Sequence, residues 1–188
     1  GKLTSTQVQA LNSAQIVALE TGDLAQMTTA QIAAMTTAQV TNLTTDQVVA
    51  LTTDQVSTLT TAQLAAFTTA QLVKMETDDV AAITTVQISA LKTAQIAALT
   101  SDQVLTLSTD QLSELKTAQI AALTTANLAK LTTDQFSVFD SAQIAALTTA
   151  QVVALTTDQV TALETRDLVL LATDVVVALT TDQASVLT

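Results

Sequence analysis

Large apolar residues recur along this chain with a period of eight, and polar residues fill fixed places between them. With position 1 set at Leu3, the register holds without insertion to Leu187. This gives 23 octapeptides over residues 3–186 and a two-residue stub at 187–188. Position 1 is always Leu, Met, Ile or Phe, and position 6 is Val, Ile, Leu or Phe except at Ala184. Such self-similarity predicts a single repeat array over residues 1–188, taken from a longer array.

The polar positions are as regular as the apolar ones. Position 3 is Ser or Thr in all 23 units, and position 5 is Gln in 18 of the 23. Position 4 is mostly Ala or Asp, positions 7 and 8 are mostly small, and the chain has no Pro and two Gly. The departures at position 5 are Asp23, Asp79, Asn127, Asp167 and Val175.

The spacing of the apolar positions excludes a single long helix and a coiled coil. Eight residues at about 100° each leave equivalent positions about 80° apart from one unit to the next, so no apolar stripe forms. A β-solenoid stays as the alternative, because Thr, Val and Ile favour strands. Its weakness is the spacing of five and then three between large apolar residues, which is not the alternation of a half-buried strand.

The pattern favours an all-α solenoid in which each octapeptide is one very short helix. Segments such as Gln-Ile-Ala-Ala-Leu favour helix, and position 6 and the next position 1 are three apart, on one helical face. The Thr-Thr pair interrupts each helix and supplies a hydroxyl cap for the next. A helix of about five to seven residues does not persist alone in water, so stacked units must bury positions 1 and 6.

Two positions compete for the helix cap. Thr at position 2 with Gln at position 5 spells a capping box. These two positions also change together, as Glu20 does with Asp23, which indicates contact between them. However, Lys92 and Lys116 at position 2 are poor caps, whereas position 3 always carries a hydroxyl. We therefore predict position 3 as the N-cap and a contact between positions 2 and 5 with either choice.

A longer period sets the number of units in a coil. Five departures from Thr at position 2, at Glu20, Lys92, Lys116, Asp140 and Glu164, are separated by three octapeptides or by a multiple of three, whereas those at Asn12, Glu76, Ser108 and Ala172 do not follow this spacing. This 24-residue period predicts three octapeptides per coil, with two or four as the alternatives.

Composition narrows the function. Among 188 residues, Lys plus Arg number 6 and Asp plus Glu 17, for a formal charge of −11. Nucleic-acid binding needs clustered cations, and a membrane span needs about 20 consecutive apolar residues, so we expect neither. The chain has no Cys and no His, which removes most metal ligands and nucleophiles. We predict no catalytic, cofactor-binding or metal-binding residue, no cofactor and no enzymatic activity.

Three features remain as candidates for chemistry. The acidic motifs at residues 20–23, 76–79 and 164–167 are interpreted as solvated charges at corners of the coil, with weak cation sites as the alternative. If coils stack, the Thr residues of successive coils line up in rows, and we interpret these Thr residues as helix caps. The alternative is that the rows form a surface that orders water or binds a crystal such as ice. For the Gln column we expect local hydrogen bonding, and the alternative is an amide ladder inside the coil.

Two resemblances attach to these residues. Residues 43–50 (LTTDQVVA) and 155–160 resemble the opening of a repeat of the DNA-reading TAL effectors. The base-reading loop and the second helix are missing, so we do not infer DNA binding. Over the whole chain, the Leu-Thr-Thr-Ala-Gln-Ile-Ala-Ala octapeptides resemble those of very large bacterial secreted or surface proteins labelled adhesin-like or haemolysin-like. This resemblance implies an extracellular bacterial stalk or adhesin segment.

We therefore expect a rigid spacer or scaffold within a larger bacterial extracellular or cell-surface protein. The alternative is a solenoid that binds a protein or a surface along one face. A binder would gather irregular exposed residues, such as Glu114, Lys116, Lys130 and Phe136, on one side. The C-terminal units from Ala172 onward look apolar and uncapped, which predicts end-to-end self-association.

Overall fold

The chain folds entirely into short helices. The computed structural model describes residues 3–163, 168–169 and 171–187, and in these ranges it contains 22 α-helices and no strand. The predicted all-α fold is confirmed and the β-solenoid alternative is wrong. By its contacts the chain divides into two compact units, residues 1–99 and 100–188, although the octapeptide register continues through the boundary.

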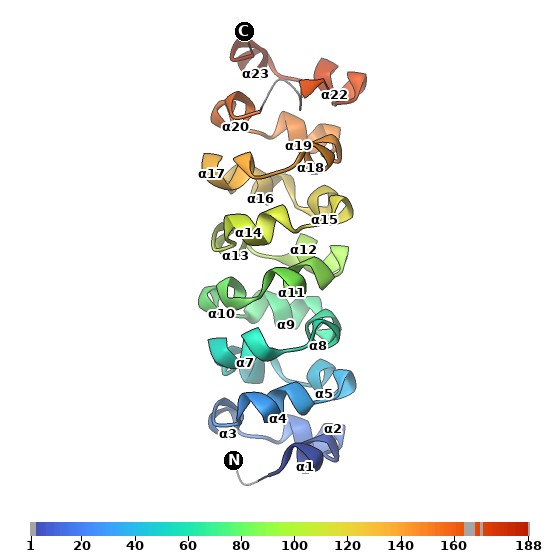
Figure 1. The fold of residues 1–188 in the computed structure, drawn as a ribbon, viewed down its shortest axis with the longest axis vertical. Helices are drawn as coiled ribbons and strands as arrows, with labels where there is room; N and C mark the ends of the chain where they lie inside the picture. The colour runs from blue at the N-terminus through green and yellow to red at the C-terminus, as the bar shows by residue number, and fades with distance from the viewer. Residues whose placement is uncertain (1–2, 164–167, 170, 188) are drawn as a thin grey trace. The chain divides into compact units, whose positions relative to one another are not determined.

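The first unit contains the following helices (Figure 1): α1 (Ser5–Gln9), α2 (Ser13–Val17), α3 (Thr21–Ala25), α4 (Thr29–Ala34), α5 (Thr37–Thr41), α6 (Thr45–Val49), α7 (Thr53–Thr58), α8 (Thr61–Ala66), α9 (Thr69–Lys74), α10 (Thr77–Ala82), α11 (Thr85–Ala90) and α12 (Thr93–Ala98).

The described part of the second unit contains these: α13 (Ser101–Leu105), α14 (Thr109–Ser113), α15 (Thr117–Ala122), α16 (Thr125–Lys130), α17 (Thr133–Ser137), α18 (Ser141–Ala145), α19 (Thr149–Val153), α20 (Thr157–Thr161), α22 (Thr173–Val177) and α23 (Thr181–Ser185).

Each helix stops because the chain becomes extended at positions 1 and 2 of the next unit. At the end of α8, the N–H of Phe67 donates to the carbonyl of Leu64 over 3.2 Å and closes the last turn. Phe67 (φ −56°, ψ 138°) and Thr68 (φ −71°, ψ 158°) are then extended, and α9 follows. No described residue has a positive φ. The corner therefore needs neither Gly nor Pro, which explains how the chain turns without them.

Helices three units apart stack on one another within each unit. In the first unit the stacks are α1–α4–α7–α10, α2–α5–α8–α11 and α3–α6–α9–α12 (Figure 1). In the second they are α13–α16–α19–α22, α14–α17–α20–α23 and α15–α18. Three octapeptides, each with its helix, thus make one coil of a solenoid, as the longer period of the sequence predicted.

The core of each coil is formed by the side chains at positions 6 and 1. Leu64 at position 6 is fully buried, and Phe67 at position 1 is 3 % exposed. Burying one such side chain stabilises the fold by about 1.5–3 kcal/mol. Phe136, expected among the exposed irregular residues, is at position 6 and 1 % exposed, packed on Phe139 with ring centroids 5.4 Å apart. That expectation is wrong for Phe136, because position 6 faces the core.

Candidate functional site

The most regular polar feature of the fold is the pair formed by positions 2 and 5 of each unit. In α6 the N–H of Thr44 donates to Gln47 Oε1 over 2.9 Å, and the N–H of Gln47 donates to Thr44 Oγ1 over 3.1 Å. This is a reciprocal capping box with position 2 as the N-cap. The predicted contact between positions 2 and 5 is confirmed, and the prediction of position 3 as the cap is wrong.

The amide nitrogen of the same glutamine bonds to the coil beneath. Gln47 Nε2 donates to the carbonyl oxygens of Ile16 and Leu19, each over 2.8 Å. These acceptors lie at the end of α2 and in the extended corner before α3, in the preceding coil. The same two bonds are made by Gln39, Gln55, Gln63, Gln71, Gln87, Gln95, Gln143, Gln151, Gln159 and Gln183.

We call this arrangement the glutamine bridge: Oε1 caps its own helix while Nε2 joins main-chain carbonyls of the preceding coil. The final carbonyls of a helix have no partner within the helix, and a buried carbonyl without a partner is costly. The carbonyl of Ile16 already accepts from the N–H of Leu19, so the bridge adds a second donor there and supplies a donor to the carbonyl of Leu19 in the corner. The Gln column therefore combines the local bonding that we expected with bonds between coils, and its partners are main-chain groups rather than other amides.

The sequence of the chain matches the model of a known repeat family. A model described as the ALTTAQ repeat matches residues 16–53, 72–109, 106–139 and 129–165, together more than half of the chain. The chain belongs to the ALTTAQ repeat family. A search of curated proteins gave no match. The Thr and Gln of the ALTTAQ unit are the residues that form the capping box and the bridge in this structure.

Lysine is tolerated at the N-cap of an ALTTAQ unit because the glutamine still closes half of the box. The N–H of Lys92 donates to Gln95 Oε1 and that of Lys116 to Gln119 Oε1, each over 2.8 Å. A lysine side chain has no acceptor for the other half. Position 2 can therefore vary as long as position 5 keeps its amide.

Asp79 is the departure with the largest physical consequence. Asp79 is 3 % exposed, and its Oδ2 is buried without a hydrogen-bond partner. Its neighbour Glu76 makes no side-chain cap bond to α10. Burial, assisted by the charges of Glu76 and Asp78, raises the pKa of Asp79 from 3.8 to about 6. The interpretation of this motif as solvated corner charge is wrong at Asp79, because position 5 faces the coil beneath.

The other described departures at position 5 differ from one another. Asn127 keeps the cap, since its N–H donates to Thr124 Oγ1 over 3.1 Å, and its Oδ1 accepts from Ser101 Oγ of the coil beneath over 2.9 Å. Asp23 in the first coil is exposed, as the charge interpretation expected. Val175 is buried beside an N-cap without a side-chain bond. The motif at 164–167 lies outside the described residues.

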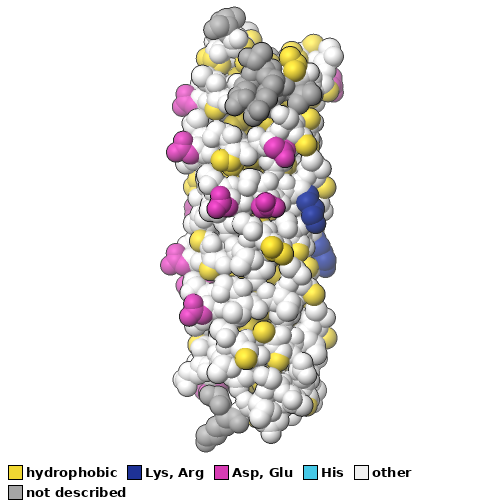
Figure 2. Space-filling model, viewed as in Figure 1, with side chains coloured by type: hydrophobic (Ala, Val, Ile, Leu, Met, Phe, Trp, Pro, Cys, Tyr) yellow, Lys and Arg dark blue, Asp and Glu magenta, His cyan; other side chains and the backbone are white. Residues whose placement is uncertain are grey.

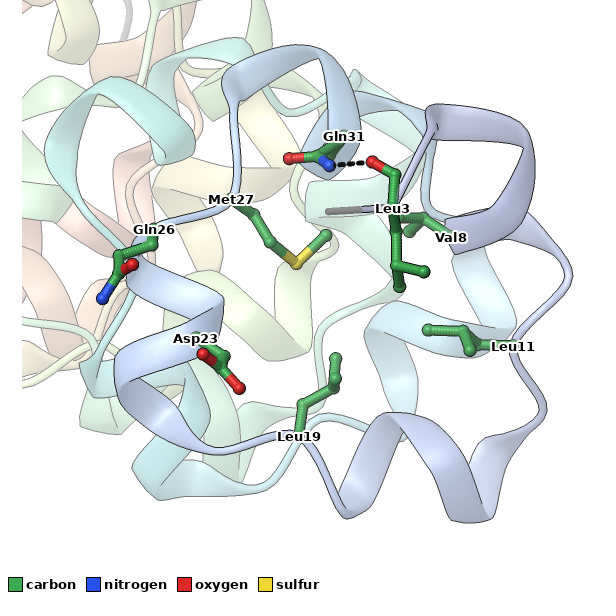
Figure 3. Close-up of a pocket in the computed structure, with 8 residues that line it drawn as sticks. All are labelled: Leu3, Val8, Leu11, Leu19, Asp23, Gln26, Met27 and Gln31. Atoms are coloured by element: carbon green, nitrogen blue, oxygen red, sulfur yellow. Dashed lines mark hydrogen bonds between the residues drawn. The ribbon is translucent and has the colours of Figure 1, made fainter. Parts of the chain in front are cut away.

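The first coil shows what the bridge leaves uncovered. Gln7 and Gln15 have no coil beneath them in this chain and are exposed, although they form the same capping boxes. Residues of the first coil line a hollow of about 420 Å³ into which Leu11, Leu19 and Met27 point (Figure 3). Gln31 closes one side of it, with Nε2 donating to the carbonyl of Leu3.

On the face drawn in Figure 2, most of the described surface belongs to neither charged nor hydrophobic side chains. Many of its acidic residues are at position 4, the second residue of a helix, where the helix dipole favours an anion. In the second unit four of them recur at every third octapeptide along one stack, at Asp110, Asp134, Asp158 and Asp182. In the described ranges, no group of three or more His, Cys, Asp or Glu is placed to hold a metal ion. No described helix combines the length and apolar character needed to cross a membrane.

Sequence reasoning missed the bridge to the coil beneath, although one signal was present. A capping box accepts Glu as well as Gln, yet position 5 is never Glu in 23 units. Only an amide has an N–H to offer the carbonyls below it. The avoidance of Glu pointed to a donor, while the identity of its partners depended on which unit lies underneath.

Proposed function

We propose that the chain is a structural repeat segment, a rigid spacer or scaffold within a larger bacterial secreted or cell-surface protein. The observation that carries the proposal is the glutamine bridge, which repeats with the octapeptide and bonds successive coils within each unit. Each bridge closes a corner with two hydrogen bonds and places no constraint on which residues occupy the outer face. A segment that must stay ordered while it separates other parts of a protein needs this kind of connection.

The distribution of irregular exposed residues favours a spacer over a binding module. Glu114 ends α14, Lys116 precedes α15 and Lys130 ends α16, so the three lie on three different stacks of the second unit. A solenoid that binds a protein or surface along one face would gather such residues on one stack. We therefore place the binding module second.

The spacer proposal is tested by exchange. Residues 3–186 are replaced, in the protein that carries them, by an unrelated α-solenoid of similar residue number. A spacer predicts that the activity of the carrier protein survives the exchange, and that deleting the segment without replacement impairs it. Loss of activity in the exchanged protein, with normal abundance, would show that the surface of the array itself binds something.

The same proposal includes the location and the activities that we expect to be absent. An extracellular or surface position is supported by the resemblance of the octapeptides to those of bacterial secreted and surface proteins. Labelling of an epitope tag on intact cells tests it, and labelling only after lysis would contradict it.

We further propose that the chain has no enzymatic activity, no cofactor and no nucleic-acid partner, given its charge of −11 and its lack of Cys and His.

End-to-end self-association is the partner that this chain offers most directly. Gln7 and Gln15 present free amide donors at the first coil, and the last coil leaves Val176 44 % exposed at position 6, which is buried throughout the first unit. A first coil seated on the last coil of a second copy would continue both the core and the bridges. Light scattering over a range of concentrations tests this association.

The control for this experiment preserves the change in charge. Replacing Gln7 and Gln15 by Glu removes both donors, and we expect it to weaken association at least tenfold. Gln9→Glu with Asn42→Asp adds the same charge at exposed positions outside position 5 and should leave association nearly unchanged. A chain that stays monomeric at every concentration would overturn the proposal, as would equal effects of the two pairs.

A further inference from the structure

Asp79 occupies the place of a bridging glutamine but carries the wrong chemistry for it when ionised. In the octapeptide register the carbonyls beneath it are those of Val48 and Leu51 in the preceding coil, and α10 packs on α7. Every glutamine bridge donates from Nε2 to the equivalent pair of carbonyls. A carboxylate has no hydrogen to donate, and Oδ2 of Asp79 is buried with no partner. An ionised Asp79 therefore has no hydrogen to offer to the carbonyl oxygens beneath it.

We propose that Asp79 binds a proton and, as a neutral acid, donates its single O–H hydrogen from Oδ2 to one of the two carbonyls, that of Val48 or that of Leu51. The stability of the contact between α7 and α10, which we call a joint, then depends on pH. The other described joints between successive coils have Gln, Asn or Val at position 5. The joint is tightest in acid, where Asp79 carries its proton. It loosens as the pH rises and an unpaired buried charge faces the carbonyl oxygens.

The electrostatic surroundings act in the same direction. The titratable groups on the elements around Asp79 are Glu76 and Asp78 at the start of α10 and Asp54 on α7, and none of these three acids is buried. None of these elements brings a cation to the buried carboxylate. Burial and the charges of Glu76 and Asp78 raise the pKa of Asp79 to about 6. Because this folded value exceeds the ordinary value of 3.8, the stabilisation is fully present below about pH 4 and is lost as the pH rises through about 6.

The direct test is the titration of the carboxyl carbon of Asp79 by nuclear magnetic resonance in the full chain, assigned with Asp79→Asn. We expect a midpoint near pH 6 for Asp79. A midpoint for Asp79 near pH 4 overturns the proposal, because the group would then be ionised and paired in some other way. The midpoint itself is read in the wild type, and Asp79→Asn serves only to assign the resonance.

The energetic test is native-state hydrogen exchange of the α7 and α10 amides in the wild type and in Asp79→Asn. Asn127 shows that the fold accepts Asn at position 5. We expect equal protection near pH 4, and at about pH 7.5 roughly a hundredfold higher protection in Asp79→Asn, which corresponds to a pKa difference of about two units. Asp78→Asn removes one of the charges that raise the pKa of Asp79 but leaves the buried carboxyl in place, so its gain in protection at about pH 7.5 should be much smaller. A difference between the wild type and Asp79→Asn that does not vary with pH would overturn the proposal.

Discussion

At the scale of single residues, one amide side chain explains most of the pattern in this ALTTAQ protein. The glutamine of each unit accepts a hydrogen bond at the start of its own helix and donates to the end of a helix in the preceding coil. Because both groups of the amide are used, neither Glu nor Leu can replace it fully. The departures support this, since Asn127 keeps a polar link to the coil beneath, while Asp79 leaves a buried oxygen without a partner.

A change of Gln63 to Glu separates the two functions of the amide. The cap at Thr60 survives through the remaining oxygen, but the donors to Ile32 and Met35 are lost and a charge is buried. We expect the free energy of unfolding to fall by about 3 kcal/mol or more near neutral pH. Gln7→Glu, in the first coil without a bridge, should cost less than about 0.5 kcal/mol. Denaturant titrations of the two variants that gave equal losses would refute the bridge.

The assignment of the cap is tested by adjacent threonines. Thr60 Oγ1 accepts from the N–H of Gln63 over 3.2 Å. Thr60→Ala should therefore destabilise the first unit by about 0.5–2 kcal/mol. Thr61→Ala, one residue later, removes a hydroxyl from the first helical residue and should cost less. Denaturation followed by far-ultraviolet circular dichroism compares the two. A larger loss at Thr61 would restore position 3 as the cap.

At the scale of elements, a helix of five or six residues exists here because its neighbours cover it. Such helices are below the length that persists alone, and most are closed at one end by a capping box and at the other by the extended corner of the next unit. The sequence predicted where the helices are and the face that they bury, because positions 1 and 6 are three apart across each corner. The prediction assigned the N-cap to position 3 instead of position 2, because Lys92 and Lys116 at position 2 are poor caps. The glutamine closes half of the box even when position 2 carries lysine.

The dependence of a helix on its buried face is tested in α8. Leu64 is fully buried, so Leu64→Ala should reduce the free energy of unfolding by about 2–5 kcal/mol. Val49, at an outward position of α6 and 39 % exposed, serves as the control. Val49→Ala should cost less than about 0.5 kcal/mol. Similar losses for the two variants in denaturant titrations would contradict the assignment of the core.

At the scale of the whole molecule, the sequence predicted a solenoid with three units per coil, and the stacking of helices three apart agrees within each unit. In such an array stability is close to a sum of unit and neighbour terms. A local defect at one joint therefore loosens its own neighbourhood first. The net charge of −11 belongs to this scale as well, because a net charge far from zero opposes non-specific association between molecules.

Colloidal behaviour near the isoelectric point tests the role of charge. The sequence has an isoelectric point of about 4.1, so net repulsion disappears as the pH falls toward 4. We expect light scattering to rise between pH 6 and 4 in roughly physiological salt, with helical content retained. Far-ultraviolet circular dichroism at the same pH values is the control. Scattering that stays constant down to pH 4 would show that repulsion is not what limits association.

The sequence by itself determined the helices, their period and the buried positions, because these follow from spacing along the chain, and it favoured three units per coil over two or four. The tertiary structure alone decided which carbonyls receive the glutamine amide and that Asp79 is buried. Both depend on the residue that lies one coil below, about 30 positions away in the chain. A pattern that is the same in every unit cannot say which unit lies beneath which, and folding into coils settles that.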